Sequence, residues 1–307
     1  MTRRLLLTGA TGFVGRHTIR PLVARGFEVH ALSSAPHAGA ENGVEWHRGS
    51  LLASGDVEAL LDKVRPTHLM HLAWYVAPGK WADAPQNYEW AQASLNLLRG
   101  FADRGGKRAV VSGSCLEYDW AAGYCSESRT PRGPHTFYGT CKNAVQELWA
   151  GYAARAGVSS AWARIFFVYG PGEHPDRLVA HVIRKLLAGD EARCSHGRQI
   201  RDYLYVQDVA DALVALAGSD LEGPINVASG QPIALSDLVA RAAAAVGRPE
   251  LVRLGAIPPA PSDAPLVVAD VERLRASLGF VPTTDLTRGL AETVAWWAAL
   301  QLETQAL

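Results

Sequence analysis

The amino-acid sequence predicts an α/β fold in which a doubly wound parallel sheet is followed by a smaller C-terminal lobe. Over the first 170 residues, short apolar runs alternate with longer segments of helical periodicity, which is typical of βαβ units. The runs are almost continuously apolar, as expected for strands that helices cover on both faces. Beyond "GPGEHP" the elements become shorter and are separated by turns such as "ASGQP", which indicates a change of architecture.

The elements of the sheet can be assigned in chain order. The predicted strands are "RLLLT", "EVHAL", "VEWHRG", "HLMHLA", "RAVVSGS" and one long strand, "SAWARIFFVYG". Helical spacing of apolar residues marks "FVGRHTIRPLVARG", "DVEALLDKV" and residues 86–104 and 138–156. We therefore expect a dinucleotide-type domain over residues 1–170, to which residues 203–228 return, and a lobe formed mainly by residues 171–307.

Composition excludes several classes of protein. The 307 residues are 48% hydrophobic and 20% charged, with a formal net charge of zero, which is typical of a globular protein. Zero net charge without a basic block argues against a nucleic-acid partner. No apolar run reaches the roughly 18–20 residues of a membrane span, and the leucines near the N-terminus are too few for a secretory signal. The four cysteines contain no CxxC pair, so we expect reduced thiols, no metal site and a cytoplasmic protein.

A glycine turn follows the first predicted strand. "LLLTGATGFVGRH" places Gly9, Gly12 and Gly15 between that strand and the first helix. Glycines at these places permit a tight turn, close approach of a pyrophosphate and close packing of helix on strand. The amides and dipole of the helix start also favour an anion. The stretch therefore predicts a Rossmann-type dinucleotide site.

The end of the second strand bears on which dinucleotide binds. An acid that binds the adenosine ribose of NAD is expected there, but "VHALSSAPH" has Ser33 and Ser34. An acid would repel a 2′-phosphate, whereas two hydroxyls can bind one, and His37 is a possible partial cation beside them. We therefore favour NADP (NADPH) as cofactor, with NAD as the alternative.

A tyrosine and a lysine supply the expected chemistry. "TFYGTCK" places Tyr138 and Lys142 one helical turn apart on one face. A free phenol has a pKa near 10, and a neighbouring ammonium and a cationic nicotinamide favour its phenolate form. Ser114 ends the strand before this helix, at the carboxyl edge where open α/β sheets bind ligands. We predict that it polarises a substrate oxygen; the alternative is a serine that caps a turn.

These motifs resemble the extended short-chain dehydrogenase/reductase family, the group of NAD(P)-dependent nucleotide-sugar epimerases, dehydratases and ketoreductases. The resemblance spans nearly the whole chain and includes "TGATGFVG", "HLAW", "YGTCK", "ARIFFVYGPGEHP", "GRQIRDYLYVQDVADAL" and "LGFVPTTDLTRGLAETVAWW". It implies that Ser114, Tyr138 and Lys142 form a catalytic triad. The residues expected at the cofactor are Gly9, Thr11, Gly12, Phe13, Val14, Gly15, Ser33, Ser34, Ser50, Leu51, Leu72, Ala73, Trp74, Ser112, Ile165 and Phe166.

The resemblance also implies a nucleotide-sugar substrate and a homodimer formed through residues 86–104 and 138–156. Arg201 would contact the nucleotide phosphates and Asp263 the ribose. Three positions depart from the family pattern: Ser50 replaces an adenine-binding acid, Phe167 an asparagine and Ala260 an arginine, so the nucleotide is not predicted. The expected substrate contacts are Trp74, Tyr75, Glu117, Phe167, Arg201, Tyr203 and Asp263. For Glu117, a helix cap or salt bridge is an equal alternative to a sugar hydroxyl.

The stretch "SGSCLEY" reduces the number of reactions expected for this chain. Dehydratases of the family resemble "TDEVY" here, because elimination of water needs an acid and a base beyond the tyrosine. This chain has Cys115 and Leu116 in those places, so we do not expect dehydration, and we interpret Cys115 as a buried packing residue. We expect an NADPH-dependent reduction of the C4 ketone of an NDP-4-keto-6-deoxyhexose in deoxysugar biosynthesis. The alternatives are a 4-epimerase with tightly bound NAD and, less favoured, a non-catalytic NAD(P)-binding regulator.

Overall fold

The main sheet has the strand order of a doubly wound α/β fold, which confirms the predicted fold class. The computed structural model describes residues 3–35, 43–77, 79–259 and 263–305. Within these residues, seven parallel strands form a sheet of order β11-β7-β5-β4-β1-β2-β3. The strands are β1 (Arg3–Thr8), β2 (Phe27–Ser33), β3 (Val44–Arg48), β4 (His68–His71), β5 (Arg108–Ser114), β7 (Ser159–Ile165) and β11 (Gly223–Val227).

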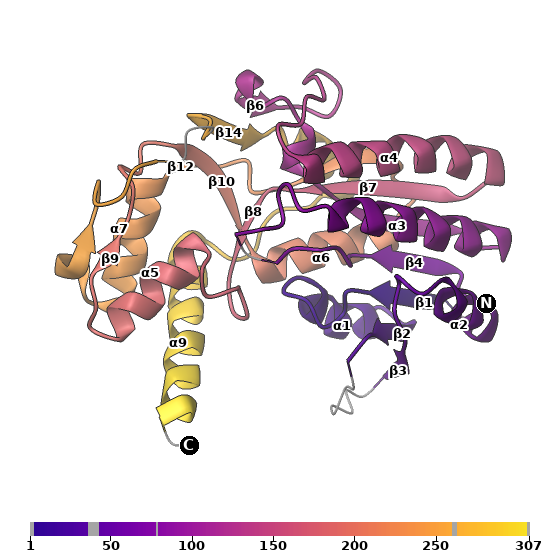
Figure 1. Cartoon of the computed structure of the whole chain (residues 1–307), viewed down its shortest axis with the longest axis horizontal. Coiled ribbons are helices and arrows are strands. Elements are labelled where there is room, and N and C mark those ends of the chain that lie inside the picture. Colours follow the sequence, from indigo (N-terminus) through magenta and orange to yellow (C-terminus); the bar gives the residue numbers. More distant parts are fainter. Residues whose placement is uncertain (1–2, 36–42, 78, 260–262, 306–307) are drawn as a thin grey trace.

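Helices cover both faces of this sheet (Figure 1). On one face α1 (Gly15–Ala24) packs beside α6 (Val206–Ala217), and the other face is covered by α2 (Ser54–Val64), α3 (Gln86–Asp103) and α4 (Phe137–Ala156). Apolar side chains of the strands fill a separate core on each side, which explains why the strand sequences are apolar throughout. Among the helices that the structure describes, none is both long and apolar enough to cross a bilayer.

A second, smaller sheet lies beyond the carboxyl ends of the main strands (Figure 1). It has the order β12-β10-β14-β6, and β8 also pairs with β10. Its strands are β6 (Tyr124–Cys125), β8 (Phe167–Tyr169), β10 (Ile200–Tyr205), β12 (Pro232–Ala234) and β14 (Leu266–Ala269). Strands β6 and β8 precede residue 170 but belong to the second sheet, and β11 follows residue 170 but belongs to the main sheet. Strands therefore cross the predicted domain boundary in both directions. The division at residue 170 stays a prediction.

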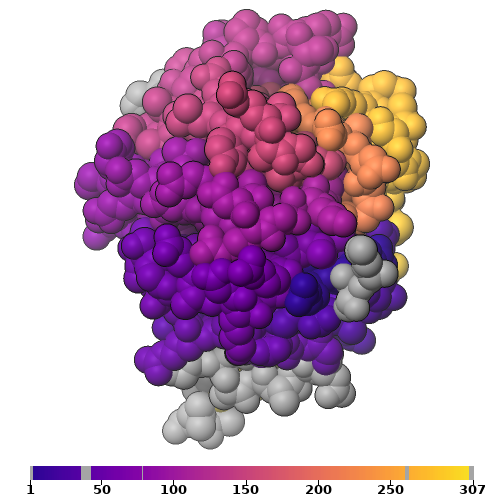
Figure 2. All heavy atoms as spheres, turned by 90° about the vertical axis from the view of Figure 1, so that its right-hand side faces the viewer, coloured from indigo at the N-terminus to yellow at the C-terminus, as the bar shows by residue number. Residues whose placement is uncertain are grey.

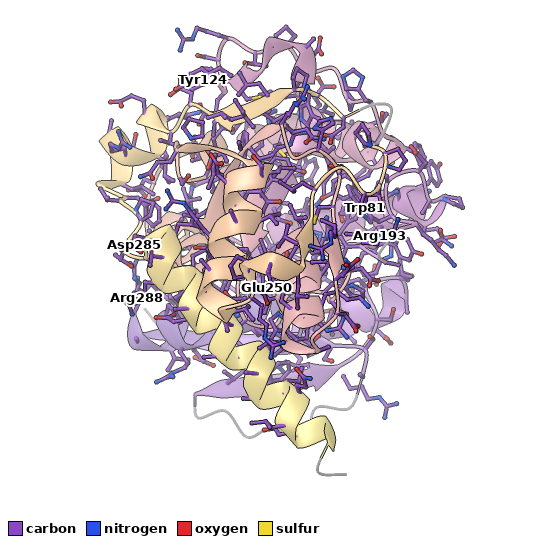
Figure 3. The ribbon with its side chains drawn as sticks, turned by 90° about the vertical axis from the view of Figure 1, so that its left-hand side faces the viewer. Trp81, Tyr124, Arg193, Glu250, Asp285 and Arg288 are labelled. Carbon is purple, nitrogen blue, oxygen red and sulfur yellow. The ribbon has the colours of Figure 1, made fainter. Side chains whose placement is uncertain are left out.

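Three helices form the core of the smaller lobe. They are α5 (Leu178–Leu187), α7 (Leu235–Val246) and α9 (Leu286–Gln305), which pack on one another beside the short pair β9 (Ala192–Arg193) and β13 (Val252–Arg253). A short helix, α8 (Glu272–Leu278), packs against β11. Asp285 caps the start of α9 by accepting a hydrogen bond from the Arg288 amide at 2.8 Å (Figure 3). The opposite end of the molecule presents mainly residues of the first half of the chain, coloured indigo to magenta in Figure 2.

The prediction of one long strand over "SAWARIFFVYG" is wrong, because this segment forms two strands that belong to two sheets. β7 pairs with β5 and β11, whereas β8 pairs with β10 in the second sheet. The change occurs at Phe166, whose amide donates to the Val227 carbonyl at 3.1 Å. The residues on both sides of the change are apolar, from Ile165 to Val168, so the pattern carries no mark of the break. This switch places Phe166 and Phe167 over the end of the main sheet.

Candidate active site

A cavity of about 1190 Å³ lies at the carboxyl ends of β1, β2, β4 and β5. Its walls come from the glycine turn, the start of α4, β8 and the segment 172–178 that leads into the smaller lobe. Ligands of open α/β sheets bind in this crevice, and the volume exceeds that of most drug-sized pockets. The cavity is therefore large enough for a dinucleotide and a second ligand.

The glycine turn at one end of the cavity has room for backbone only. Gly9 has φ +76°, and a Cβ there would lie 2.7 Å from the Ala73 amide nitrogen. A Cβ on Gly15 would lie 2.0 Å from the Gly9 carbonyl oxygen. No side chain caps the start of α1; the Arg16 and His17 amides donate to the Gly12 and Val14 carbonyls at 3.2 and 3.1 Å, and the helix dipole favours an anion at this end. The predicted residues Thr11, Gly12, Phe13, Val14 and Gly15 all line this end.

The ends of β2 and β3 form the next part of the wall. Ser33 and Ser34 line the cavity, and the Ser33 hydroxyl donates to the Ala35 carbonyl at 2.9 Å, which leaves its oxygen free to accept. Ser50 and Leu51 line it too, and the Ser50 amide donates to Asp56 Oδ2 at 2.9 Å. The predicted contacts Leu72, Ala73, Trp74, Ser112, Ile165 and Phe166 also lie on the wall. His37 is outside the described residues.

The three predicted catalytic residues meet in the same cavity. Ser114 ends β5, and its hydroxyl accepts from the Leu116 amide at 3.2 Å, so it also caps the short turn that follows. Tyr138 lies in the first turn of α4, with its ring edge-on to Trp74 and Trp81 at centroid distances of 6.0 and 5.1 Å. Lys142, one turn later, donates to the Ser112 carbonyl at 2.8 Å and lies 3.9 Å from the centre of the Trp74 ring.

Burial dominates the electrostatics of the triad. It raises the pKa of Tyr138 above the ordinary value, with Glu117 adding to the rise and a hydrogen bond with Ser114 opposing it. Burial also lowers the pKa of Lys142 to about 7, and Glu117 opposes that change. The protein alone therefore keeps the Tyr138 phenol protonated at neutral pH, which is the state needed to give a proton to a substrate oxygen.

Glu117 does not reach the cavity, so the prediction that it binds a sugar hydroxyl is wrong. The short turn after Ser114 directs this fully buried carboxylate back toward β7, where it accepts from Arg164 Nε at 2.7 Å and Trp162 Nε1 at 2.9 Å. It also accepts from the Ser114 amide at 2.7 Å. A Cβ on Gly113 would lie 2.6 Å from this carboxylate, so glycine is required beside it. The structure shows both alternatives, a helix cap through the Ser114 amide and a salt bridge to Arg164.

Tyr75 is likewise absent from the cavity wall, although Trp74 and Val76 both line it. Consecutive side chains of an extended segment point to opposite sides, and Tyr75 packs instead against the core beneath α3 and α4. The prediction of a substrate contact at Tyr75 is therefore wrong, because its side chain packs against the core and does not line the cavity.

Arg201 and Asp263 pair with each other instead of lining the cavity. Their side chains form an ion pair, Arg201 is 3% exposed, and Asp263 also accepts from Gln199 Nε2 at 2.7 Å. The Arg201 guanidinium lies 5.5 Å from the centre of the Phe167 ring, behind the wall that Phe167 and Tyr203 form. The side chains of Phe167 and Tyr203 thus line the cavity, where they can contact a substrate as predicted. The side chains of Arg201 and Asp263 do not line it. Ala260 is outside the described residues.

The sequence interpretation missed a second set of polar residues, on the segment that follows β8. Glu173, His174, Asp176 and Arg177 line the cavity, and the start of their segment contacts α1, where His17 Nε2 lies 3.0 Å from the Pro171 carbonyl. Glu173 is 5% exposed, burial raises its pKa to about 8, and its Oε2 has no hydrogen-bond partner among the described residues. The charged run "EHPDR" directly after a strand was the available signal, but nothing local shows that it folds back over the sheet.

The fold and this site define an NAD(P)-binding enzyme of the short-chain dehydrogenase/reductase type. The model for the NAD dependent epimerase/dehydratase family matches residues 5–228, and the chain belongs to this family. It is 29% identical to a dTDP-4-dehydro-6-deoxy-D-allose reductase of a Streptomyces species over 96% of both chains. It is 27% identical to UDP-glucuronate 4-epimerase 4 of Arabidopsis thaliana over 95% of this chain and 75% of that protein. The crystal structure of Thermus thermophilus UDP-glucose 4-epimerase with NAD is 27% identical, with a TM-score of 0.86 over 96% of this chain and 98% of that one.

Proposed function

We propose that this protein reduces the C4 ketone of an NDP-4-keto-6-deoxyhexose with NADPH, as a step of deoxysugar biosynthesis. The observation that carries the proposal is the chemistry at the end of β5, where the cavity wall has Ser114, Cys115 and Leu116 and no carboxylate. Elimination of water would need an acid and a base at that place, whereas reduction of a ketone needs one proton. The likeness to the dTDP-4-dehydro-6-deoxy-D-allose reductase over both full lengths supports the same choice.

In this mechanism the residues of the triad bind and protonate the carbonyl oxygen. Bound NADPH supplies the hydride that C4 accepts. Tyr138 gives its phenolic proton to the C4 oxygen as the carbonyl becomes an alcohol, and Ser114 donates a hydrogen bond to the same oxygen. Lys142, which lies 5.7 Å from the centre of the Tyr138 ring, stabilises the resulting phenolate and holds the nicotinamide ribose.

The preference for NADPH over NADH is based on the residues at the end of β2. Ser33 and Ser34 line the cavity there, and no carboxylate lines it beside them among the described residues. A 2′-phosphate on the adenosine ribose would meet no like charge at this place, and the Ser34 hydroxyl could donate to it, whereas the Ser33 hydroxyl donates to the Ala35 carbonyl. NAD remains the alternative cofactor.

The proposal can be tested by NADPH consumption with a panel of NDP-4-keto-6-deoxyhexoses, followed by NMR of the product at C4. Tyr138→Phe is expected to lower kcat at least a hundredfold, because the proton donor is lost, while the affinity for NADPH stays unchanged. Tyr75→Phe is the matched control, since this tyrosine lies beside the site without lining it. Full turnover in Tyr138→Phe, or no oxidation of NADPH with any member of the panel, would reject the reductase.

A second candidate is a nucleotide-sugar 4-epimerase with tightly bound NAD. The likeness to the Thermus 4-epimerase over nearly both full chains favours it. An epimerase oxidises and re-reduces the same carbon, so its NAD stays bound through the cycle. Mass spectrometry of the protein as isolated distinguishes the two: stoichiometric NAD favours the epimerase. Tight NADPH binding without turnover of any nucleotide-sugar would favour the regulator.

We also propose a cytoplasmic homodimer. All four cysteines are free thiols, which fits a reducing compartment. On the neighbouring helices α3 and α4, Tyr88 and Leu148 are each 60% exposed, and a second copy that packs on these helices would cover them. Light scattering at micromolar concentration should give twice the mass of one chain, and Leu148→Arg should shift it toward one.

A further inference from the structure

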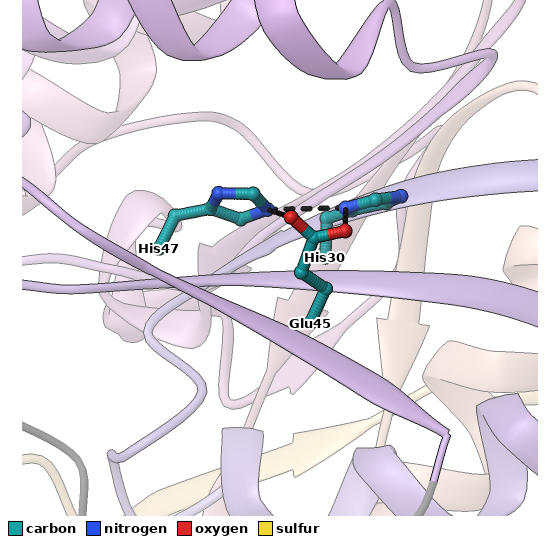
Figure 4. A group of neighbouring side chains, drawn as sticks. All are labelled: His30, Glu45 and His47. Carbon is teal, nitrogen blue, oxygen red and sulfur yellow. Dashed lines mark hydrogen bonds and ion pairs between the residues drawn. The ribbon is translucent and has the colours of Figure 1, made fainter.

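A cluster of metal-ligating side chains lies outside the cavity, on the two outermost strands of the main sheet (Figure 4). His30 projects from β2, and Glu45 and His47 project from the edge strand β3. His30 stands opposite Glu45 in the strand register, and residues two apart on a strand share a face. The parallel pairing of β2 and β3 therefore brings all three side chains together.

The three side chains place one donor atom each within 4.8 Å of the others. His30 Nδ1 lies 3.1 Å from His47 Nε2, and each imidazole faces a different oxygen of Glu45: His30 Nδ1 lies 3.5 Å from Oε2 and His47 Nε2 lies 3.6 Å from Oε1. Bonds of about 2.0–2.1 Å to a tetrahedral Zn²⁺ would separate its ligand atoms by about 3.3–3.4 Å. Two imidazoles and one carboxylate are a set that zinc uses, with the fourth position left to water.

The surroundings prepare the two imidazoles as ligands. His30 Nε2 lies 3.0 Å from Glu28 Oε1, so the ring donates its proton there and turns the lone pair of Nδ1 toward the cluster, as carboxylates behind metal-binding histidines do. The buried His47 ring directs Nε2 toward His30 and Nδ1 toward Lys63. Glu45 is 54% exposed, so water has access to the fourth position.

Lys63 of α2 is the competitor for this site. Its Nζ lies 3.0 Å from Glu45 Oε1 and 3.5 Å from His47 Nδ1. An ammonium group at that place neutralises the carboxylate that a metal ion would use. The Lys63 side chain is 64% exposed, so it can move into solvent when a cation of higher charge enters.

We propose that His30, Glu45 and His47 bind one divalent transition-metal ion of the zinc class, which joins β2 to the edge strand β3. β2 leads directly to Ser33, and β3 leads to Gly49 and Ser50, all on the wall of the cavity. The ion would therefore hold together the two strand ends that shape the expected adenosine end of the cofactor site. This inference is independent of the reaction that the cavity catalyses.

The test is calorimetric titration of the chelator-treated full-length protein with zinc chloride, with the visible spectrum of the cobalt(II) complex as the second readout. We expect one ion per chain, a Kd of about 1 µM, the intense absorption of tetrahedral cobalt and a higher Tm with zinc. His47→Gln should abolish binding and Glu45→Gln should weaken it at least tenfold. Lys63→Met should tighten it several-fold, because the competing ammonium is removed. His181→Gln, on α5 in the other lobe, is the control and should bind as the wild type does.

The outcomes separate the proposal from incidental binding. Zinc affinity that is unaffected by Glu45→Gln, or unchanged or weaker in Lys63→Met, would place the ion elsewhere and overturn the proposal. An octahedral cobalt spectrum would do the same. Glu45 and Lys63 are largely exposed, so their variants remain informative if His47→Gln fails to fold.

Discussion

Replacing Glu117 by alanine should lower the free energy of unfolding by about 3–5 kcal/mol. The carboxylate and its partner Arg164 are 0% and 2% exposed, and they are joined at 2.7 Å. Removal of Glu117 leaves a buried guanidinium without its counter-ion, and it also leaves the Trp162 indole N–H and the Ser114 amide without their acceptor. Each unmade hydrogen bond alone costs about 1–3 kcal/mol, and because these losses share one carboxylate they are not added together.

Urea unfolding of Glu117→Ala, Arg164→Met and the double variant measures this loss. We expect the double variant to be more stable than the sum of the single losses predicts, because neither charge is then left alone. Glu147→Ala on α4 is the control: the ion pair of Glu147 with Arg132 is exposed, and surface pairs contribute about 0–1 kcal/mol. An unfolding free energy within about 1 kcal/mol of the wild type, together with a tenfold higher KM for the sugar nucleotide, would refute the structural role and return Glu117 to the substrate site.

Three further predictions concern the cavity and its support. Burial raises the pKa of Glu173 from 4.5 to about 8, so its contribution to stability is fully present below pH 4.5 and is lost as the pH rises to 8. The wild type should therefore lose up to about 1.4 kcal/mol per pH unit in this window, and urea unfolding of Glu173→Gln should show a flatter profile; equal slopes would contradict the burial argument. Ser33→Asp should weaken NADPH binding at least tenfold without weakening NADH binding, as measured by fluorescence titration, whereas an equal loss for both would indicate a misfolded site. Gly113→Ala should destabilise the fold by about 1–3 kcal/mol, because its Cβ would lie 2.3 Å from Trp162 Nε1, while Gly151→Ala, with nothing within 4 Å, should not; equal melting temperatures would count against the crowding at Gly113.

The parts of the site that the sequence predicts are those set by local geometry. The strand, glycine turn and helix around Gly9 and Gly15 follow from residues within one short segment, since only glycine fits there. Tyr138 and Lys142 share a face because four residues make about one helical turn. The predicted helices over residues 86–104 and 138–156 agree with α3 and α4 to within a residue at each end.

The parts that the sequence does not predict depend on residues far apart in the chain. Glu117 turns away from the cavity because Arg164 lies on the neighbouring strand, 47 residues later. The change of sheet at Phe166 depends on which strands offer free edges, and the apolar pattern is the same on both sides of it. Glu173 reaches the cavity only because that change of sheet carries the chain over the end of β5. His30 and His47 meet through strand pairing, which their spacing in the sequence does not reveal.

The triad does not distinguish epimerases, dehydratases and reductases, because members of all three classes in the family can share it. The positions and protonation states of the acids around the cavity distinguish these reactions better. At the end of β5 the nearest acid, Glu117, is used to hold Arg164 beneath the strand. Two acids do line the cavity, Glu173 and Asp176, and burial raises the pKa of Glu173 to about 8, which favours its protonated form at neutral pH. Tyr138 is protonated as well, and Lys142, with a pKa of about 7, is only partly charged. Tyr138 and Glu173 can therefore supply protons to a ligand in the cavity. That supply fits the proposed reduction of a ketone, which consumes a proton.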